Sequence, residues 1–405
     1  MNVWVINQYA STPRTNTGAG ERFYYLGEYW AAVKNWNVTI FSGSFNHLFL
    51  SPPERKFPAN SERVNKNLHF VWVWVNRYKS QSSIGRLVNW VSFVTCLFLV
   101  QKRRLKKPHV IILSSMSLWP VLNVMVLKIR YPDVKFIFEV RDIWPLTPVY
   151  LGDFSRKHPI IMMMFWLEKM AFTICDHFVS VLPNAQLRAF EVDNNFNKGF
   201  TWIPNGITTS LLKSKSPKED ENKIFTVVYT GAIGTANAME YVVQAAKILE
   251  FENVRFEIYG DGPEKSDLEA LAGNCKNIKF YGKIPKSEVQ KKLAHADVTI
   301  ISWRNSPLYK YGVSANKYND YMLSAKPIIS ASAFKNDLVN VADCGIQVQP
   351  ENANGIVSAI QHLKRMPLED RKKLGQNGFS YLQQNQLYPV LGEKFIKIIK
   401  TITKC

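Results

Sequence analysis

Cysteine is scarce in this sequence, and the spacing of the cysteines argues against a structural metal site. Five cysteines occur among 405 residues, at Cys96, Cys175, Cys275, Cys344 and Cys405. They form neither a CxxC pair nor a Cys/His cluster with zinc spacing, which argues against a structural metal. An odd, scattered set of thiols is typical of a reducing compartment, so a cytosolic location is expected.

Long hydrophobic runs are also missing. The best candidate, residues 87–100 (LVNWVSFVTCLFLV), is shorter than the roughly 20 residues that cross a bilayer. The first residues, MNVWVI, lack the basic region and cleavage site of a signal peptide. Their apolar pattern predicts a β-strand instead. Residues 87–100 predict either a buried helix or a helix in a membrane interface. In the second case Trp90 and Phe93 would be the anchors, and the basic run at 102–107 would face anionic headgroups.

Acidic residues are few. There are 32 Asp and Glu residues against 51 Lys and Arg residues, which gives a net charge of +19. This surplus indicates an anionic partner: nucleic acid, anionic lipid or a phosphate-rich substrate. For nucleic acid, the charge is the only support, because the sequence contains no recognised nucleic-acid-binding motif. Nucleic acid therefore ranks last among these partners.

The pattern of apolar runs predicts the fold. Short apolar runs alternate with helical patterns and are expected to be strands at 3–7, 38–41, 70–75, 110–113, 136–140 and 178–181. The pattern restarts after a polar linker, with strands expected at 226–229, 255–259, 278–281 and 298–301. The polar, proline-containing segment 46–67 is expected to be a loop. This alternation predicts an α/β protein of two doubly wound, Rossmann-like domains facing a central cleft.

Glycines follow the first expected strand. Gly18 and Gly20, in the string NTGAG, would let backbone approach a ligand at a helix N-terminus. The third glycine of a dinucleotide fingerprint is missing, and the second strand ends without an acidic residue to hold a ribose. NAD binding is therefore disfavoured.

Two charged pairs occupy positions suited to ligand chemistry. Arg141 and Asp142 directly follow an expected strand, where the Arg could bind phosphate or acceptor and the Asp could orient an acceptor hydroxyl. Lys317 and Asp320 share one face at a helix start, where they could hold phosphate and ribose hydroxyls. The alternatives are a structural ion pair at the strand end and an exposed ion pair on the helix.

Five strings in the second half resemble the GT-B glycosyltransferases of family 4. They are YTGAIG, IYGDGPE, FYGKIP, ADVTIIS and NKYNDYMLSAKPII, and the first half adds NQYASTPRTNTGAGERFYYLGEYW, EVRDIWP and IPNGI. Within the family the chain looks most like bacterial O-antigen and capsule enzymes similar to N-acetyl-L-fucosaminyl transferases. The resemblance implies an acceptor-binding domain over 1–205 and a nucleotide-sugar domain over 206–385. A C-terminal helix, 386–405, is expected to pack back on the first domain.

The resemblance implies a retaining transferase without metal or cofactor. Its donor would be a nucleoside-diphosphate sugar, expected to be a UDP-N-acetylamino sugar. Its acceptor would be an undecaprenyl-diphosphate-linked glycan of lipopolysaccharide O-antigen or capsule. The enzyme would be cytoplasmic and peripherally bound to the anionic inner membrane.

The resemblance also assigns roles to individual residues. Arg141 and Asp142 would be catalytic, at the acceptor side. The donor-binding residues would be Gly18, Gly20, Gly231, Arg304, Asn316, Lys317 and Asp320.

Two departures from the family pattern concern the donor site. The family's E-x7-E pair falls on Gly312 and Asp320, and no cation follows Gly231. The phosphate role therefore moves to Lys317, with Arg304 as a helper.

Two alternatives come from other classes. A nucleotide-sugar 2-epimerase of the same fold would need paired proton-transfer groups. Only His177 has a neighbouring carboxylate, Asp176, and adjacent strand residues point to opposite faces. The other alternative, a non-catalytic membrane-bound scaffold, is opposed by the two intact charged pairs.

Overall fold

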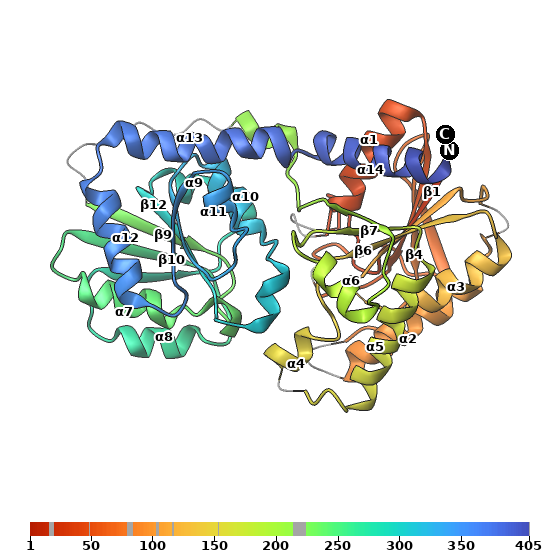
Figure 1. Ribbon diagram of the computed structural model, residues 1–405, viewed down its shortest axis with the longest axis horizontal. Helices are drawn as coiled ribbons and strands as arrows, with labels where there is room; N and C mark the ends of the chain where they lie inside the picture. The colour runs from red at the N-terminus through yellow and green to blue at the C-terminus, as the bar shows by residue number, and fades with distance from the viewer. Residues whose placement is uncertain are drawn as a thin grey trace. The chain divides into compact units, whose positions relative to one another are not determined.

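The chain divides into two compact units, which we describe separately. The computed structural model describes residues 1–15, 20–47, 49–78, 84–102, 105–115, 117–152, 154–213 and 224–404. The first unit comprises Met1–Pro204 and Tyr388–Cys405, and the second comprises Asn205–Leu387 (Figure 1). The domain boundaries expected from the sequence, after residues 205 and 385, lie within two residues of these limits.

The first unit is built on an eight-stranded sheet with the order β3-β4-β2-β1-β5-β6-β7-β8. Its strands are β1 (Asn2–Ile6), β2 (Asn37–Gly43), β3 (Ala59–Arg63), β4 (Leu68–Val73), β5 (Val110–Ser114), β6 (Lys135–Val140), β7 (His177–Ser180) and β8 (Gly199–Trp202). Its helices are α1 (Arg22–Lys34), α2 (Ile84–Leu99), α3 (Val121–Arg130), α4 (Thr147–Leu151), α5 (Pro159–Ile174), α6 (Gln186–Val192) and α14 (Tyr388–Thr403).

Segment 46–67 differs from the expectation of a loop. It contains β3, which pairs antiparallel with β4, whereas the other strand pairs of this sheet are parallel. The sequence ANSER shows no apolar pattern because an edge strand needs only one hydrogen-bonded neighbour and little burial. Periodicity therefore could not reveal it.

Helices cover both faces of this sheet. Figure 1 shows α1 and α14 on one side and α2, α3 and α5 on the other. The C-terminal helix α14 packs on α1, where the Trp30 indole donates a hydrogen bond to the Gly392 carbonyl at 3.2 Å. The Trp30 and Phe395 rings meet edge to face, with centroids 5.4 Å apart. The chain's last helix thus completes the core of the first unit.

The membrane anchors proposed for residues 87–100 are wrong. This stretch lies in α2, and Trp90 and Phe93 are buried, with exposed fractions of 5% and 0%. They face the core because they share the inner stripe of the helix with Leu97. Among the helices of the described residues, none is both long and apolar enough to cross a bilayer.

The second unit has a six-stranded parallel sheet with the order β11-β10-β9-β12-β13-β14. Its strands are β9 (Phe225–Thr230), β10 (Val254–Tyr259), β11 (Ile278–Gly282), β12 (Val298–Ser302), β13 (Ile328–Ala331) and β14 (Gly345–Val348). Its helices are η2 (Thr209–Lys213), η3 (Thr235–Asn237), α7 (Glu240–Ile248), α8 (Lys265–Ala272), α9 (Lys286–Ala294), η4 (Pro307–Tyr311), α10 (Asn316–Leu323), α11 (Leu338–Val341), α12 (Ala353–Arg365) and α13 (Leu368–Asn385).

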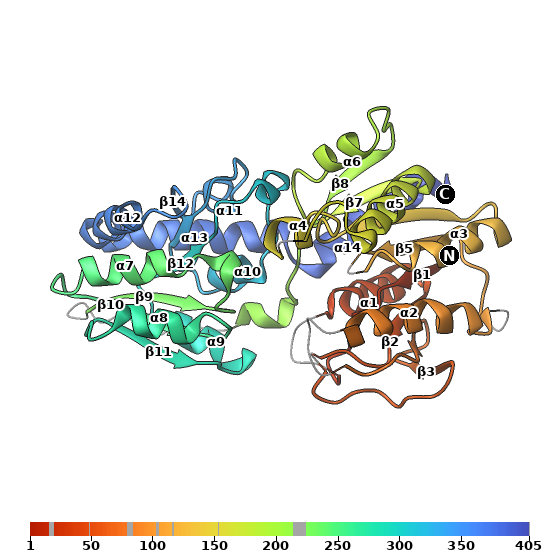
Figure 2. The same cartoon turned by 90° about the horizontal axis from the view of Figure 1, so that it is seen from below.

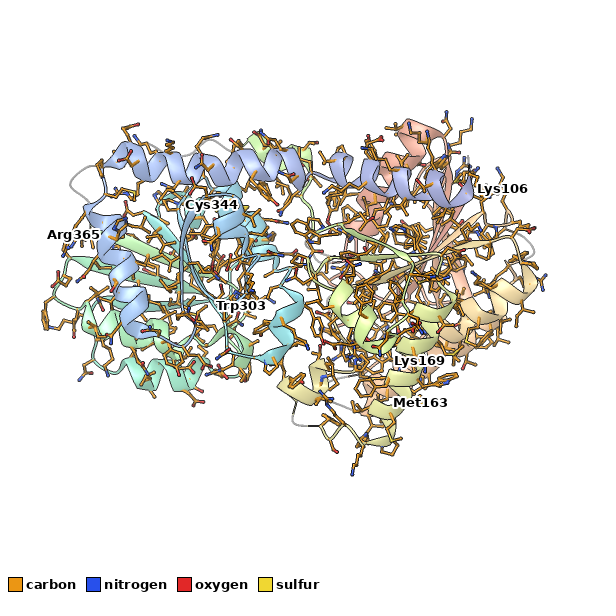
Figure 3. All side chains as sticks on the ribbon, viewed as in Figure 1. Lys106, Met163, Lys169, Trp303, Cys344 and Arg365 are labelled. Atoms are coloured by element: carbon orange, nitrogen blue, oxygen red, sulfur yellow. The ribbon has the colours of Figure 1, made fainter. Side chains whose placement is uncertain are left out.

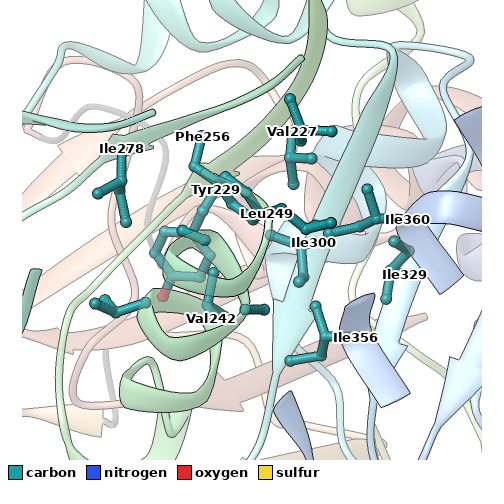
Figure 4. Packing of buried hydrophobic residues seen from close by; sticks show 14 of the residues in the cluster. Val227, Tyr229, Val242, Leu249, Phe256, Ile278, Ile300, Ile329, Ile356 and Ile360 are labelled. Carbon is teal, nitrogen blue, oxygen red and sulfur yellow. The ribbon is translucent and has the colours of Figure 1, made fainter. Parts of the chain in front are cut away.

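The core of the second unit lies between this sheet and helices α7 and α12. Val227 and Ile300 from the central strands pack against Val242 of α7 and against Ile356 and Ile360 of α12 (Figure 4). These strands are mostly apolar and fully buried, as is typical of parallel strands covered on both faces. The rigid sheet fixes the loops that leave its carboxyl ends.

Candidate active site

Strand order identifies the edge of each sheet that can hold a ligand. In the first unit the connections diverge on either side of β1 and β5, and in the second on either side of β9 and β12. Parallel α/β sheets bind ligands beyond the carboxyl ends of their strands, at such switch points. Gly20 follows β1, Arg141 and Asp142 follow β6, Gly231 follows β9, and Arg304 and α10 follow β12. Gly18 lies outside the described residues.

Lys317 is held at the switch point of the second unit. Its ammonium group donates hydrogen bonds to the Tyr229 hydroxyl and, at 2.6 Å, to the Asn237 Oδ1. It also lies over the Tyr229 ring, 4.4 Å from the centroid. Burial lowers the pKa of Lys317 to about 7, because desolvation disfavours the charged ammonium. An anion at this point would restore the charge.

Gly231 makes room for this lysine. Its φ is +151°, and a Cβ there would lie 2.1 Å from the Lys317 Cε. Gly231 was expected from the family resemblance to be a donor-binding residue. The structure adds that the missing side chain is what lets Lys317 lie along β9.

Gly231→Ala is therefore expected to displace Lys317 from Tyr229 and Asn237. We expect nucleotide affinity to fall at least about tenfold, measured by titration with UDP, because a displaced cation costs on the order of 1.4 kcal/mol or more in anion binding. Gly234→Ala in the same loop is the matched control, since Gly234 has an extended backbone and no atom within 4 Å of a new Cβ. Equal losses in both variants would contradict this role of Gly231.

Helix α10 presents Lys317 and Asp320 to different neighbours. Asp320 pairs with Lys286 at the start of α9, whereas Lys317 contacts β9 and η3. The two residues therefore do not form the exposed ion pair that was the alternative interpretation. Asp320 is 14% exposed, and burial raises its pKa while Lys286 opposes the rise. No side-chain hydrogen bond caps the N-terminus of α10, where Asn316 is exposed.

The position of the family's first glutamate has its own backbone requirement. Gly312 adopts φ +87° and ψ −179°, a conformation that is essentially restricted to glycine. A glutamate at this position would strain the turn after η4. The glycine that replaces the family's glutamate at position 312 therefore goes together with a different backbone conformation of this turn.

Arg304 is engaged by carboxylates. It forms ion pairs with Glu240 and, at 3.5 Å, with Glu351, and its Nε donates to the Thr235 carbonyl at 3.2 Å. These contacts fasten η3, which carries Asn237, to the loop after β12. In the structure Arg304 positions η3 through these contacts. A direct contact between Arg304 and the donor phosphate stays a prediction.

A buried ion pair connects the site segments of the first unit. Arg22, two residues after Gly20, contacts Glu139, two residues before Arg141, at 3.0 Å, and the exposed fractions of the side chains are 3% and 0%. Arg22 also donates to the carbonyls of Ile203 and Pro204. Gly20 itself is packed closely, since a Cβ there would lie 2.5 Å from the Tyr9 carbonyl oxygen.

Arg141 and Asp142 lie beside an aromatic cluster. The Arg141 backbone N–H donates to the Ser115 hydroxyl at 3.2 Å, and Asp142 is exposed. Nearby in sequence, the Trp144 ring meets the Trp90 ring edge to face at 5.5 Å. The Arg86 guanidinium lies over both rings, at 5.2 and 5.6 Å from their centroids. This edge combines a cation, a carboxylate and aromatic faces.

Sequence reasoning missed three residues that contact the expected donor-binding side chains. Tyr229 and Asn237 hold Lys317, and Lys286 holds Asp320. Tyr229 and Asn237 stand in or beside the string YTGAIG, but only cations were sought there. No pattern pointed to Lys286, because its contact joins segments 34 residues apart.

The chain is similar to known glycosyltransferases in sequence and in fold. Residues 224–365 match the family model for glycosyl transferases group 1. The chain is 23% identical over 283 residues to "Probable glycosyltransferase WbjE" of Pseudomonas aeruginosa. The aligned region covers 66% of this chain and 68% of that protein. A sucrose-phosphate synthase structure from Thermosynechococcus elongatus has a TM-score of 0.73 at 14% identity, covering 100% and 99% of the two chains. Anabaena HepE in complex with UDP-glucose has a TM-score of 0.65 at 12% identity, covering 99% and 100%.

These comparisons confirm the fold class and the kind of enzyme. The fold is α/β, with parallel sheets in two Rossmann-like domains of the GT-B type. Residues 224–365 match the group 1 glycosyl transferases, and the protein is a glycosyltransferase. The epimerase alternative is not favoured. The carboxylate and imidazole that it could have used have other partners, since Asp176 pairs with Lys128 and the His177 Nε2 hydrogen-bonds to Thr201.

Proposed function

We propose that the protein is a retaining, metal-independent glycosyltransferase of surface polysaccharide synthesis. It transfers a sugar, expected to be an N-acetylamino sugar, from a UDP-sugar to an undecaprenyl-diphosphate-linked glycan of O-antigen or capsule. The observation that carries the proposal is the placement of Lys317 at the β9–β12 switch point, poised by Tyr229 and Asn237.

The donor would bind with its diphosphate at Lys317. Breaking the sugar–phosphate bond leaves negative charge on the nucleoside diphosphate, and a fixed cation stabilises charge that develops in the transition state. The uncapped N-terminus of α10 adds its partial positive charge at the same place. Asp320, from the same helix, would accept the ribose hydroxyls.

Protein groups thus provide the positive charge for which many transferases use a metal ion. No group of three or more His, Cys, Asp or Glu residues in the described parts of the chain is arranged to hold a metal ion. Metal independence itself stays a proposal. It rests on the cation and helix terminus that face the expected diphosphate.

The acceptor would bind at the carboxyl edge of the first unit. Arg141 would contact its diphosphate or an acidic sugar, and Asp142, exposed at the strand end, would orient the attacking hydroxyl. The name of the Pseudomonas aeruginosa relative says only that it is a probable glycosyltransferase. The polysaccharide pathway is proposed from the sequence resemblance to O-antigen and capsule enzymes.

The nucleotide specificity and metal requirement can be tested together. We expect UDP to raise the thermal unfolding midpoint by several degrees with EDTA present, because a ligand that binds only the folded state stabilises it. GDP, ADP and CMP, measured in parallel, serve as controls for base selectivity. No shift with any nucleotide, or a shift that EDTA abolishes, would contradict the proposal.

A further inference from the structure

One helical layer of the first unit exposes many apolar side chains. Among the described residues, thirteen of the twenty-five exposed large hydrophobic side chains fall between residues 84 and 166. They belong to α2, α3, α4, α5 and the loop between α4 and α5. The opposite layer, α1 and α14, exposes only Val33 among its described residues. Scattered apolar residues are normal on a protein surface, but a concentration on one face marks a contact surface.

The largest side chains of this face gather around α4 and the start of α5. We call this group the α4–α5 surface, and its members are Tyr150, Leu151, Phe154, Met162, Met163 and Trp166, with exposed fractions of 37% to 59%. Met162 and Trp166 are four residues apart and share one face of α5. Met164, Leu167 and Ala171 of the same helix are buried. Figure 3 shows Met163 and Lys169 at the periphery of the unit, on α5.

The charges around the α4–α5 surface are positive. Arg156, Lys157 and Lys169 are exposed. The sequence from 143 to 174 holds two carboxylates: Asp153, which lies outside the described residues, and Glu168, which is buried in an ion pair with Arg188 at 2.6 Å. An apolar surface with tryptophan and a positive border matches the interface of an anionic bilayer, where apolar groups enter the headgroup region and cations meet phosphates.

The α4–α5 surface adjoins the edge that carries the acceptor-side residues. Helix α4 begins at Thr147, soon after Arg141 and Asp142 at the end of β6. Helix α2 begins near the same edge, since its Trp90 contacts Trp144, and its first residue Ile84 is 79% exposed. Figure 2, seen from below, shows the helices of this layer toward the viewer.

We infer that the α4–α5 surface docks on an anionic lipid bilayer and places the carboxyl edge of the first unit at the headgroups. The inference deepens the proposed function by naming the surface that meets the membrane, although the docking itself needs no sugar transfer. It differs from the sequence-based expectation, which used residues 87–100 and the basic run at 102–107.

The structure gives most of that basic run other partners. Lys102 donates to the Leu97 carbonyl at the end of α2, and Lys106 contacts Asn37, at the amino end of β2, at 3.3 Å. Lys107 lies over the Tyr131 ring, 5.8 Å from the centroid. Arg103 and Arg104 lie outside the described residues. The described lysines are thus at the opposite edge of the sheet from Arg141.

Vesicle co-sedimentation tests the inference. The probe is a vesicle of equal parts phosphatidylglycerol and phosphatidylcholine, with pure phosphatidylcholine for comparison. We expect the full chain to bind the anionic vesicles at least about tenfold more tightly, and Phe154→Ser/Met162→Ser/Trp166→Ser to lose at least about tenfold in binding. Lys106→Ser/Lys107→Ser is the control and is expected to bind as the unaltered protein does.

Three results would overturn the inference. They are full binding by the triple variant, loss of binding in the lysine control alone, and a dimer in light scattering that only the triple variant loses. The urea unfolding transition of each variant, followed by circular dichroism, shows whether the first unit, which carries the substitutions, is still folded, and stabilisation by UDP reports on the second unit. Vesicle binding without any UDP response would remove the proposed function but leave the docking surface standing.

Discussion

Replacing Lys317 by methionine is expected to reduce kcat/KM for the sugar-nucleotide by about a hundredfold to a thousandfold, the range seen when one preorganised group at a developing charge is lost. Methionine keeps most of the aliphatic volume beside Gly231, so the fold should persist, and an unchanged thermal midpoint would show this. Initial rates of UDP release, measured with saturating acceptor, provide the readout. The effect should appear in kcat as well as KM, because the charge on the leaving group grows in the transition state.

The matched control for this variant is Lys291→Ala. Lys291 lies on α9 of the same unit, is 72% exposed and forms a surface ion pair with Glu288. Its loss should change the rate less than about twofold, since exposed pairs contribute little. Near-normal turnover by Lys317→Met would remove the phosphate role from this lysine.

Arg22→Ala is expected to have the largest effect on stability. It leaves the fully buried Glu139 carboxylate without its counter-charge and removes the donors to the Ile203 and Pro204 carbonyls. Breaking a buried pair on one side costs about 3–5 kcal/mol. We expect a corresponding fall in the free energy of unfolding of the first unit, measured by urea titration and followed by circular dichroism.

Two further variants separate the causes. Arg22→Met/Glu139→Leu removes both charges, and it should recover the part of the loss that comes from the uncompensated carboxylate. Arg14→Ala breaks the exposed contact with Glu62, at 4.0 Å, and should leave stability nearly unchanged. If Arg22→Ala were as stable as Arg14→Ala, the ion pair would have no part in joining the Gly20 segment to the end of β6.

Much of the fold could be predicted because its buried parallel strands are mostly apolar. The strand at 110–113 is a continuous apolar run and that at 298–301 is interrupted only by Thr299, and the alternation of such runs with helical patterns defines the doubly wound class. Strand β3 could not be predicted, since edge pairing leaves little apolar signal. The direction in which α2 faces could not be predicted either, because both of its stripes carry large apolar residues.

Residues of the candidate site could be predicted where they directly follow a strand or begin a helix. Arg141, Lys317 and Asp320 could be proposed from their positions after strands and at a helix start. The partners that control them could not, because Asn237 and Lys286 reach them only through tertiary packing. The different roles of the charged residues in the string EVRD, residues 139–142, could not be predicted either. Glu139 is buried against Arg22, whereas Arg141 and Asp142 lie at the carboxyl edge of the sheet.

The central claim is that Lys317 holds the donor diphosphate, and proton uptake on binding tests it most directly. With a pKa of about 7, the free lysine is mostly neutral at pH 8, and a bound diphosphate would raise its pKa and restore the proton. Affinity should therefore be highest below pH 7 and fall as the pH rises above 7. A UDP-sugar is the suitable ligand, because its diphosphate diester does not titrate in this range.

The measurement is calorimetric titration of the UDP-sugar at pH 8 in two buffers of different ionisation enthalpy. The account predicts uptake of most of one proton by the unaltered protein and almost none by Lys317→Met, which should also bind more weakly. Equal proton uptake and equal affinity in the two proteins would contradict it.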